Sequence, residues 1–423
     1  MAAAPARLVV VGQGYVGLPL AMRAVEVGFD VVGFEIDKTR VERLNAGDSY
    51  VEDITATELR AALDCGRYQA TADVNVLTGF DVAVITVPTP LRETLPDLSH
   101  IESAARMLAP ALKKGSVVIL ESTTYPGTTE ELLVPLLEAG SNLVIGSDVL
   151  VGYSPERIDP GNQEWTFVTT PKVVSGVNAE SLAKVDAFYS QLVHQTVPVS
   201  SPKEAELTKL LENTFRHVNV ALVNELAMFA GELGIDVWEA IDAASTKPFG
   251  FMPFRPGPGV GGHCLPVDPS YLSWQVKRSL GENFRFVELA NDVNEHMPAY
   301  VVRRLTRSLN ERTLPVKGTR ILVLGLGYKK NTSDARESPA VNVTLLLAGL
   351  GADVRAADPH VDPTVPGGIV QRVEFSVEEI EAADAVVVLT NHDAFDVDTI
   401  ASHAKYVFDC RKVVPAAAHV EYL

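Results

Sequence analysis

The sequence is poor in cysteine and in positive charge. It has three cysteines in 423 residues, Cys65, Cys264 and Cys410, and their spacing indicates neither a disulfide framework nor a zinc site. Lysine and arginine number 36 against 54 aspartate and glutamate residues, so the formal net charge is −18. This balance argues against nucleic acid or an anionic membrane surface as the main partner. We predict a protein of a reducing compartment with no metal site.

Long apolar runs are missing as well. No run approaches the ~18 residues of a membrane-spanning helix, and the first residues lead into a strand without the pattern of a secretory signal. A hydrophobic content of 47% and a charged content of 21% are typical of globular proteins. We therefore expect a cytoplasmic protein, with no membrane partner, that is long enough for two to four domains of about 100–200 residues.

Apolar runs alternate with helical stretches in the first part of the chain. Residues 8–11 and 30–34 are predicted strands, and residues 18–27 between them have the pattern of a helix. Further strands are predicted at 81–88, 116–122 and 143–148. Such alternation is typical of a parallel, doubly wound α/β sheet.

The middle of the chain has a different texture. Residues 203–233 have helical periodicity and no proline, which predicts one helix roughly 45 Å long, with two shorter helices as the alternative. A Pro/Gly-rich loop (248–262) and a helical region (about 270–310) follow. After residue 318 the strand–glycine–helix pattern returns, with further strands at 383–390 and 406–410. We predict three domains, which are an α/β domain at 1–200, a helical domain at 201–310 and a second Rossmann-like α/β domain at 311–423.

The first glycine turn has the spacing GxGxxG. Gly12, Gly14 and Gly17 stand between a predicted strand and a predicted helix, where they permit a tight turn, close approach of a pyrophosphate and close helix packing. Glu35 ends the next strand, where a carboxylate accepts hydrogen bonds from ribose hydroxyls and repels a 2′-phosphate. The turn therefore predicts NAD rather than NADP, and the alternative is that Glu35 is a capping or surface acid.

The second glycine turn, GLGYKKNTSDARES, lacks the third glycine. It carries Lys329, Lys330 and Arg336 instead, and three cations beside a strand end in an acidic protein indicate a phosphate site. The alternative is a solvated basic surface. Two nucleotide-type domains suggest two nucleotide ligands, a dinucleotide cofactor and a substrate that is itself a nucleotide derivative.

The segment GPGVGGHCLPVD (257–268) places Cys264 on a predicted loop. A thiolate adds to an aldehyde, and the adduct can lose hydride to give a thioester that water hydrolyses. A thiol needs cationic neighbours to ionise, and Lys209 on the predicted long helix is one candidate. Asp268 is placed to act as a base toward water. The alternative for Cys264 is a small buried hydrophobic residue.

Several blocks in this order resemble one known family. They are GQGYVGLPLA, VPTP, ESTTYPGTT, YSPERIDPG, KLLENTFRHVNVALVNELA, PGPGVGGHCLPVDP and GYKKNTSDARESPA. Together they resemble the nucleotide-sugar dehydrogenases, which include UDP-glucose and GDP-mannose dehydrogenases. The resemblance implies an NAD-dependent, four-electron oxidation of C6 of a nucleotide-linked sugar to a carboxylate.

The resemblance also implies roles for individual residues. The implied catalytic residues are Cys264, Lys209, Asn213, Asp268, Glu156 and Thr123. The implied NAD contacts are Gly12, Gly14, Tyr15, Val16, Gly17, Glu35, Arg40, Thr89, Thr123 and Arg336. The implied substrate contacts are Glu156, Lys209, Asn213, Arg255, Gly261 and Lys330. Each has an ordinary structural alternative, such as a helix cap, a turn former or a solvated side chain.

The glycine-rich block before Cys264 resembles the branch of the family that oxidises UDP-N-acetylhexosamines. Our prediction is UDP-N-acetylglucosamine, with UDP-N-acetylmannosamine or UDP-glucose as alternatives. Arg255 departs from that branch, which often has an aromatic residue there. Two other functions remain open, a two-electron β-hydroxyacid-type dehydrogenase and a non-catalytic nucleotide sensor. The long helix predicts a homodimer, because the family usually pairs through this region.

Overall fold

The structure is a computed structural model that describes residues 6–51, 53–92, 95–158, 162, 164–262 and 264–423. The chain divides into two compact units. The first comprises residues 1–212 with 274–279, and the second comprises residues 213–273 with 280–423. No described helix has the length and apolar character needed to cross a membrane.

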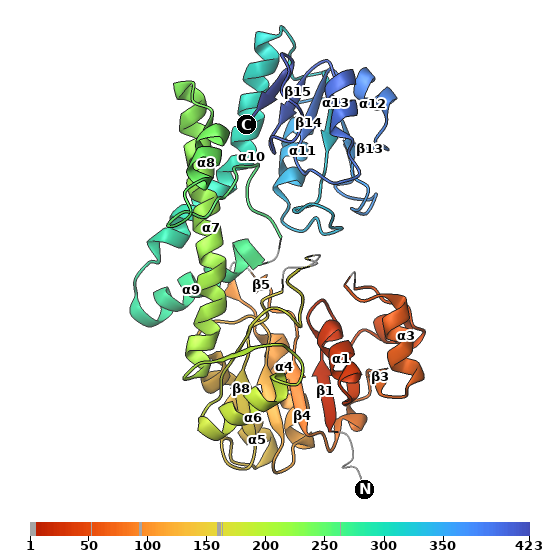
Figure 1. The fold of residues 1–423 in the computed structure, drawn as a ribbon, viewed down its shortest axis with the longest axis vertical. Helices are drawn as coiled ribbons and strands as arrows, with labels where there is room; N and C mark the ends of the chain where they lie inside the picture. Colours follow the sequence, from red (N-terminus) through yellow and green to blue (C-terminus); the bar gives the residue numbers. More distant parts are fainter. Residues whose placement is uncertain (1–5, 52, 93–94, 159–161, 163, 263) are drawn as a thin grey trace. The chain divides into compact units, whose positions relative to one another are not determined.

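The first unit contains a six-stranded parallel sheet in the order β3-β2-β1-β4-β7-β8 (Figure 1). Its strands are β1 (Arg7–Val11), β2 (Asp30–Phe34), β3 (Tyr68–Thr71), β4 (Val82–Ile85), β7 (Val117–Leu120) and β8 (Leu150–Tyr153). Its helices are α1 (Gly17–Glu26), α2 (Lys38–Asn45), α3 (Ala56–Asp64), α4 (Ser99–Leu108), α5 (Val134–Ser141) and α6 (Ala179–Tyr189). Strands β4, β7 and β8 are buried at every residue, as expected for a parallel sheet that is covered on both faces.

Two small pairs of strands complete this unit. The pair β9 (Lys172–Val174) and β10 (Thr196–Pro198) is parallel, and the pair β5 (Leu91–Arg92) and β6 (Leu95–Pro96) is antiparallel. The predicted strand at 143–148 is wrong. Gly146 adopts φ +89° in a turn there, and the chain enters the sheet afterwards, at β8.

The second unit repeats the same sheet order as β13-β12-β11-β14-β15-β16. Its strands are β11 (Arg320–Leu324), β12 (Asp353–Ala357), β13 (Gln371–Arg372), β14 (Ala385–Val388), β15 (Val407–Asp409) and β16 (Val420–Tyr422). Its shorter helices are α11 (Pro339–Gly349), α12 (Val377–Ala382) and α13 (Val397–His403). The predicted fold class, two parallel α/β domains with a helical middle region, is confirmed.

The helical region consists of α7 (Pro202–Leu233), α8 (Val237–Ser245), α9 (Cys264–Leu280) and α10 (Arg285–Glu311). The long helix is one uninterrupted element of 32 residues, as predicted, and it contributes residues to both units. In the second unit, α10 packs its buried face, from Met297 to Leu309, into the same core as β11 and α11. Helix α7 packs Val223, Ala227 and Ala230 into a small core with Trp238 and Ile241 of α8.

Candidate active site

The first glycine turn joins β1 to α1. Gly12 has φ +96°, and a Cβ atom on it would lie 2.8 Å from the carbonyl oxygen of Thr86. A Cβ atom on Gly17 would collide with the carbonyl oxygen of Gly12, whereas one on Gly14 would meet nothing within 4 Å. Gly12 and Gly17 are therefore required by the fold itself. Gly14 leaves an open approach to the backbone, and this fits a dinucleotide pyrophosphate.

Glu35 lies immediately after β2, beside this turn. Its carboxylate accepts backbone N–H groups from Gln13 at 3.2 Å and from Asp37 at 3.1 Å. The Arg40 guanidinium lies 3.8 Å from the Glu35 carboxylate and is half exposed. Thr89 is buried, whereas Tyr15 is exposed. These residues, predicted to contact NAD, lie around the carboxyl ends of β1, β2 and β4, where doubly wound sheets bind ligands.

A buried carboxylate cluster follows β7 and β8. We use this name for Glu121, Glu156, Lys172 and Tyr189, all of which are at most 9% exposed. The Lys172 ammonium forms ion pairs with Glu121 and, at 3.3 Å, with Glu156. The Tyr189 hydroxyl donates to Glu121 at 3.1 Å. Sequence reasoning selected Glu156 alone, because a lysine that begins an apolar strand and a tyrosine within a helix carry no motif.

The two carboxylates of this cluster have different acidities. Burial raises the pKa of Glu121 to about 7, despite the attraction of Lys172. Burial also acts on Glu156, but Lys172 and then Lys209 outweigh it and hold the pKa of Glu156 below its ordinary value. Glu156 also accepts the N–H of Arg157 at 2.6 Å. The structure thus places Glu156 as an ionised carboxylate near Lys209, the buried lysine of α7.

A glutamate of α7 anchors the turn that follows β7. Glu206 accepts the N–H of Gly127 at 2.6 Å, the N–H of Thr129 at 2.9 Å and the Thr129 hydroxyl at 2.7 Å. Burial raises its pKa to about 7, against these three bonds. Thr123, predicted to hold water and NAD, is partly exposed in the same turn. Glu206 was not predicted, and its contacts fix Lys209, one turn further along α7, relative to this turn.

In the second unit, Asn213 and Asp268 form a buried pair. The Asn213 amide donates to the Asp268 carboxylate, and the two residues are 0% and 2% exposed. The Arg216 guanidinium donates to the side-chain oxygen Oδ1 of Asn213. Two residues predicted for catalysis are therefore in contact.

The prediction that Cys264 lies on a loop is wrong, because helix α9 begins at this residue. Pro266 favoured a loop in the sequence, but proline is tolerated in the first turn of a helix, where the N–H groups have no helical partner. Asp268 follows one turn later on the same helix. The side chain of Cys264 and the whole of His263 lie outside the described residues.

The glycines before Cys264 are explained by close packing within the second unit. A Cβ atom on Gly261 would lie 2.7 Å from the carbonyl oxygen of Glu337 and 2.9 Å from the Tyr328 side chain. The N–H of Gly262 donates to the carbonyl oxygen of Arg336 at 3.2 Å. Further upstream, the Arg255 guanidinium pairs with Asp242 of α8 at 2.5 Å. The loop is thus fitted against the second glycine turn.

Two of the three cations of that turn, Lys330 and Arg336, form ion pairs with acids. The Lys330 ammonium lies 2.5 Å from Asp393, and its side chain is 45% exposed. Arg336 binds the Asp334 carboxylate through two bonds of 2.9 and 2.6 Å and is 63% exposed. Both are accessible, so both remain candidates for ligand contact.

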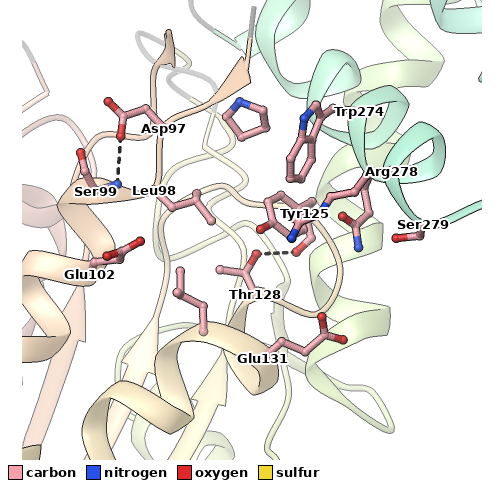
Figure 2. Close-up of a pocket in the computed structure, with 13 residues that line it drawn as sticks. Asp97, Leu98, Ser99, Glu102, Tyr125, Thr128, Glu131, Trp274, Arg278 and Ser279 are labelled. Carbon is pink, nitrogen blue, oxygen red and sulfur yellow. Dashed lines mark hydrogen bonds between the residues drawn. The ribbon is translucent and has the colours of Figure 1, made fainter. Parts of the chain in front are cut away.

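A cavity of about 590 Å³ lies elsewhere in the first unit. Figure 2 shows Tyr125 and Trp274 on its wall, with ring centroids 5.0 Å apart, and Arg278 beside them. Asp97, Glu102 and Glu131 make its charge predominantly acidic. Among the predicted active-site residues whose side chains the structure describes, none lines this cavity, so the active-site proposal is not built on it.

Comparison with known proteins identifies the family. Models of the UDP-glucose/GDP-mannose dehydrogenase family match residues 6–193 (NAD binding domain), 203–296 (central domain) and 322–416 (UDP binding domain). The chain belongs to this family of dehydrogenases. The predicted family, an NAD-dependent oxidoreductase activity and the NAD cofactor are thereby confirmed, and the third domain is a UDP binding domain.

Relatives within this dehydrogenase family carry the names of several sugars. The chain is 41% identical over 359 residues to a UDP-N-acetyl-D-glucosamine 6-dehydrogenase of Pseudomonas aeruginosa, covering 84% of this chain and 83% of the relative. It is 37% identical over 391 residues to a UDP-N-acetyl-D-mannosamine dehydrogenase of Pyrococcus horikoshii, covering 92% and 90%. A solved structure of the dehydrogenase from P. horikoshii, titled as acting on UDP-D-ManNAc, matches with a TM-score of 0.89 at 34% identity, covering 98% of each chain. The chain is therefore a UDP-sugar dehydrogenase whose hexosamine is left open by these names.

Proposed function

We propose that the protein oxidises C6 of UDP-N-acetylglucosamine to the carboxylate in two steps at one site. The buried Asn213–Asp268 pair, one helical turn from Cys264 on α9, is the observation that carries this proposal. An acid held behind a cysteine suits oxidation beyond the aldehyde, since a thioester must then be hydrolysed. The sugar is chosen from the glycine-rich block before Cys264 and from the P. aeruginosa relative.

In this proposal NAD, held by the first glycine turn and Glu35, would supply the hydride acceptor for each oxidation, and the chain performs everything else. Removal of hydride from C6 and of the hydroxyl proton gives the aldehyde, to which the Cys264 thiolate adds. Loss of a second hydride from this thiohemiacetal gives a thioester. Water, which gives a proton to Asp268, then attacks the thioester and releases the carboxylate and the thiol. One alcohol, one water and two NAD+ therefore give one carboxylate, two NADH and three protons.

The surrounding residues supply charge and position. Lys209 stabilises the oxyanions at C6, and Asn213 holds the sugar or the oxyanion together with Asp268. Glu156 lies close enough to Lys209 for the two charges to act on each other, which suits a carboxylate that orients substrate and water. A helix N-terminus favours a thiolate, and α9 begins at Cys264. Lys330 and Arg255 contact the nucleotide, and Glu35 with Arg40 contacts the adenosine ribose of NAD.

The decisive experiment counts NADH formed per sugar consumed. UDP-N-acetylglucosamine is compared with the N-acetylmannosamine, N-acetylgalactosamine and glucose analogues and with GDP-mannose. We expect two NADH per molecule and the highest kcat/KM for UDP-N-acetylglucosamine. One NADH per sugar would support the two-electron alternative, and binding without NADH would support a sensor.

Cys264 is tested separately by mass spectrometry of enzyme trapped during turnover. Wild type is expected to carry a covalent sugar adduct, and Cys264→Ala to form no carboxylate. A Cys264→Ala variant that makes acid at near the wild-type rate would contradict the mechanism.

We also propose that the protein is a homodimer. An apolar stripe on the second-unit part of α7 consists of Phe215, Leu222, Leu226, Phe229 and Leu233, which are 45–72% exposed. Their spacings of seven, four, three and four residues place them on one face of the helix. Large apolar side chains in such a continuous row indicate an interface, and a second copy offers an identical row to pair with it.

A further inference from the structure

The second sheet has its own ligand-binding edge, where the carboxyl ends of β12, β11 and β14 meet. Strand order reverses between β11 and β14, which is the switch point at which doubly wound sheets bind ligands. Asp358 directly follows β12, the second glycine turn follows β11, and His392 follows β14. Asp358 therefore occupies the place in the second unit that Glu35 occupies in the first.

The carboxylate of Asp358 is saturated by donors. One oxygen accepts the N–H groups of Leu326 at 2.6 Å and Gly327 at 3.0 Å, and also His392 Nε2 at 2.9 Å. The other oxygen accepts the N–H groups of His360 and Val361 at 2.8 and 2.9 Å. Its side chain is 0% exposed. Burial opposes ionisation, but His392 and the backbone donors outweigh it and hold the pKa of Asp358 well below its usual range.

A carboxylate with five donors has no lone pair left for a ribose hydroxyl. Glu35 of the first unit, in contrast, accepts two backbone N–H groups, one at each oxygen. The acid at the second switch point thus anchors the protein's own turn instead of reading a ribose.

His392 connects this anchor to the loop that carries Lys330. Its Nδ1 lies 2.9 Å from the backbone nitrogen of Asn331, which can only donate. Nδ1 must therefore be the unprotonated nitrogen, and Nε2–H donates to Asp358. Both ring nitrogens are used, and the side chain is completely buried.

Asn331 is held on its other side by Asp393. The side-chain amide of Asn331 donates to the Asp393 carboxylate at 2.6 Å, and the backbone N–H of Asp393 donates to the side-chain oxygen Oδ1 of Asn331 at 3.0 Å. Asn331 has φ +56°, a conformation that asparagine and glycine adopt most readily. Lys330, the preceding residue, therefore sits on a backbone fixed from both sides.

We propose that Asp358, His392, Asn331 and Asp393 form a clasp of positioning residues that holds the Lys330 loop in the conformation that binds UDP. The clasp touches no part of the substrate and acts through Lys330, so it rests on the nucleotide contact proposed for that lysine. It sets affinity for the UDP portion of the substrate. NAD binding should change little, because every residue predicted to contact NAD except Arg336 lies in the first unit.

Two substitutions of His392 separate its two bonds. Glutamine reaches the position of Nε2 and keeps the donor to Asp358, but it loses the acceptor for Asn331. Asparagine reaches the position of Nδ1 and keeps that acceptor, but it loses the bond to Asp358. In titrations of the full-length enzyme with UDP, we expect His392→Gln to weaken UDP binding roughly 10-fold and His392→Asn to stay within about 2-fold. The KM for NAD should stay within about 2-fold of wild type in both variants, since Arg336 is the one predicted NAD contact in this unit.

Asn331→Gly provides a second route, since it removes both side-chain bonds to Asp393 and keeps a residue suited to positive φ. It should fold normally and also weaken UDP binding. His403→Gln, the same exchange on the partly exposed α13, is the control and should bind UDP as wild type does.

If His392→Gln and Asn331→Gly bind UDP as wild type does and only melt at a lower temperature, the clasp contributes to folding stability and not to UDP affinity. That result would overturn the inference. A wild-type enzyme that binds UDP but oxidises none of the UDP-sugars would overturn the proposed function alone. A wild type that binds no UDP would overturn both.

Discussion

The ammonium group of Lys172 forms ion pairs with two buried carboxylates in the first unit. Lys172 is 3% exposed and pairs with both Glu121 and Glu156. A buried charge is costly unless it is paired, so the three groups depend on each other. The low pKa of Glu156 follows from this arrangement, because burial alone would raise it. Lys172 thus controls the protonation of a residue proposed to work in catalysis, although no contact with substrate is assigned to it.

Replacing Lys172 with methionine should therefore raise the pKa of Glu156. If Glu156 works as a carboxylate, its ionised fraction at a given pH falls, and the acidic limb of kcat/KM moves to higher pH by about one unit or more. Lys172→Arg keeps the positive charge and should restore the wild-type limb. The pH profiles are measured at a temperature where circular dichroism shows each variant folded. Coinciding profiles for Lys172→Met and wild type would refute the control of Glu156 by Lys172.

At the level of single residues, the sequence points to a position where a motif contains it. Asn213 and Asp268 belong to separate sequence blocks, and the structure brings them into contact; their catalytic roles stay predictions. Glu121, Lys172 and Glu206 were missed, because a polar side chain in an apolar run gives no sign of its partner. Lys172 lies 51 residues from Glu121 in the sequence, and Glu206 lies 77 residues from Thr129, so only the fold brings these partners together.

At the scale of elements, the turn between β1 and α1 separates glycines needed for folding from a glycine suited to a ligand. Gly17→Ala places a methyl group against the carbonyl oxygen of Gly12, and overpacking of this kind costs about 1–3 kcal/mol or more. Gly14→Ala meets no protein atom within 4 Å. We expect the free energy of unfolding of Gly14→Ala to lie within about 1 kcal/mol of the wild-type value. The same variant should bind NAD roughly 10-fold more weakly.

Chemical denaturation and NAD titration measure the two effects. Gly349→Ala serves as the control, since its added Cβ also meets open space, at the end of α11. Equal loss of stability in Gly14→Ala and Gly17→Ala, or undiminished NAD affinity in Gly14→Ala, would contradict this division of roles.

The elements themselves were predictable to different degrees. Uniformly apolar strands such as β4, β7 and β14 follow from sequence, because burial on both faces demands such runs. The start of α9 at Cys264 did not, because a helix that begins with two prolines in six residues does not have a helical pattern. Pro266 is tolerated in the first turn, where N–H groups have no helical partner, but Pro269 lies inside the helix. The strand predicted at 143–148 failed for the opposite reason, since an apolar run lies here without burial: Val144 is 58% exposed and the chain turns at Gly146.

At the scale of the whole molecule, the apolar stripe of α7 is the interface proposed for a homodimer. Placing carboxylates in the middle of this row, in the double variant Leu226→Glu/Phe229→Glu, would bury unpaired charge in a dimer interface. We expect light scattering to give the mass of two chains for wild type and of one chain, 45.6 kDa, for the double variant. Leu350→Glu changes a leucine that is 50% exposed outside the stripe, and it should remain dimeric. A monomeric wild type, or a double variant that stays dimeric, would contradict the proposed interface. A double variant that is monomeric and keeps the wild-type melting temperature would show that these side chains stabilise the dimer and not the fold of the single chain.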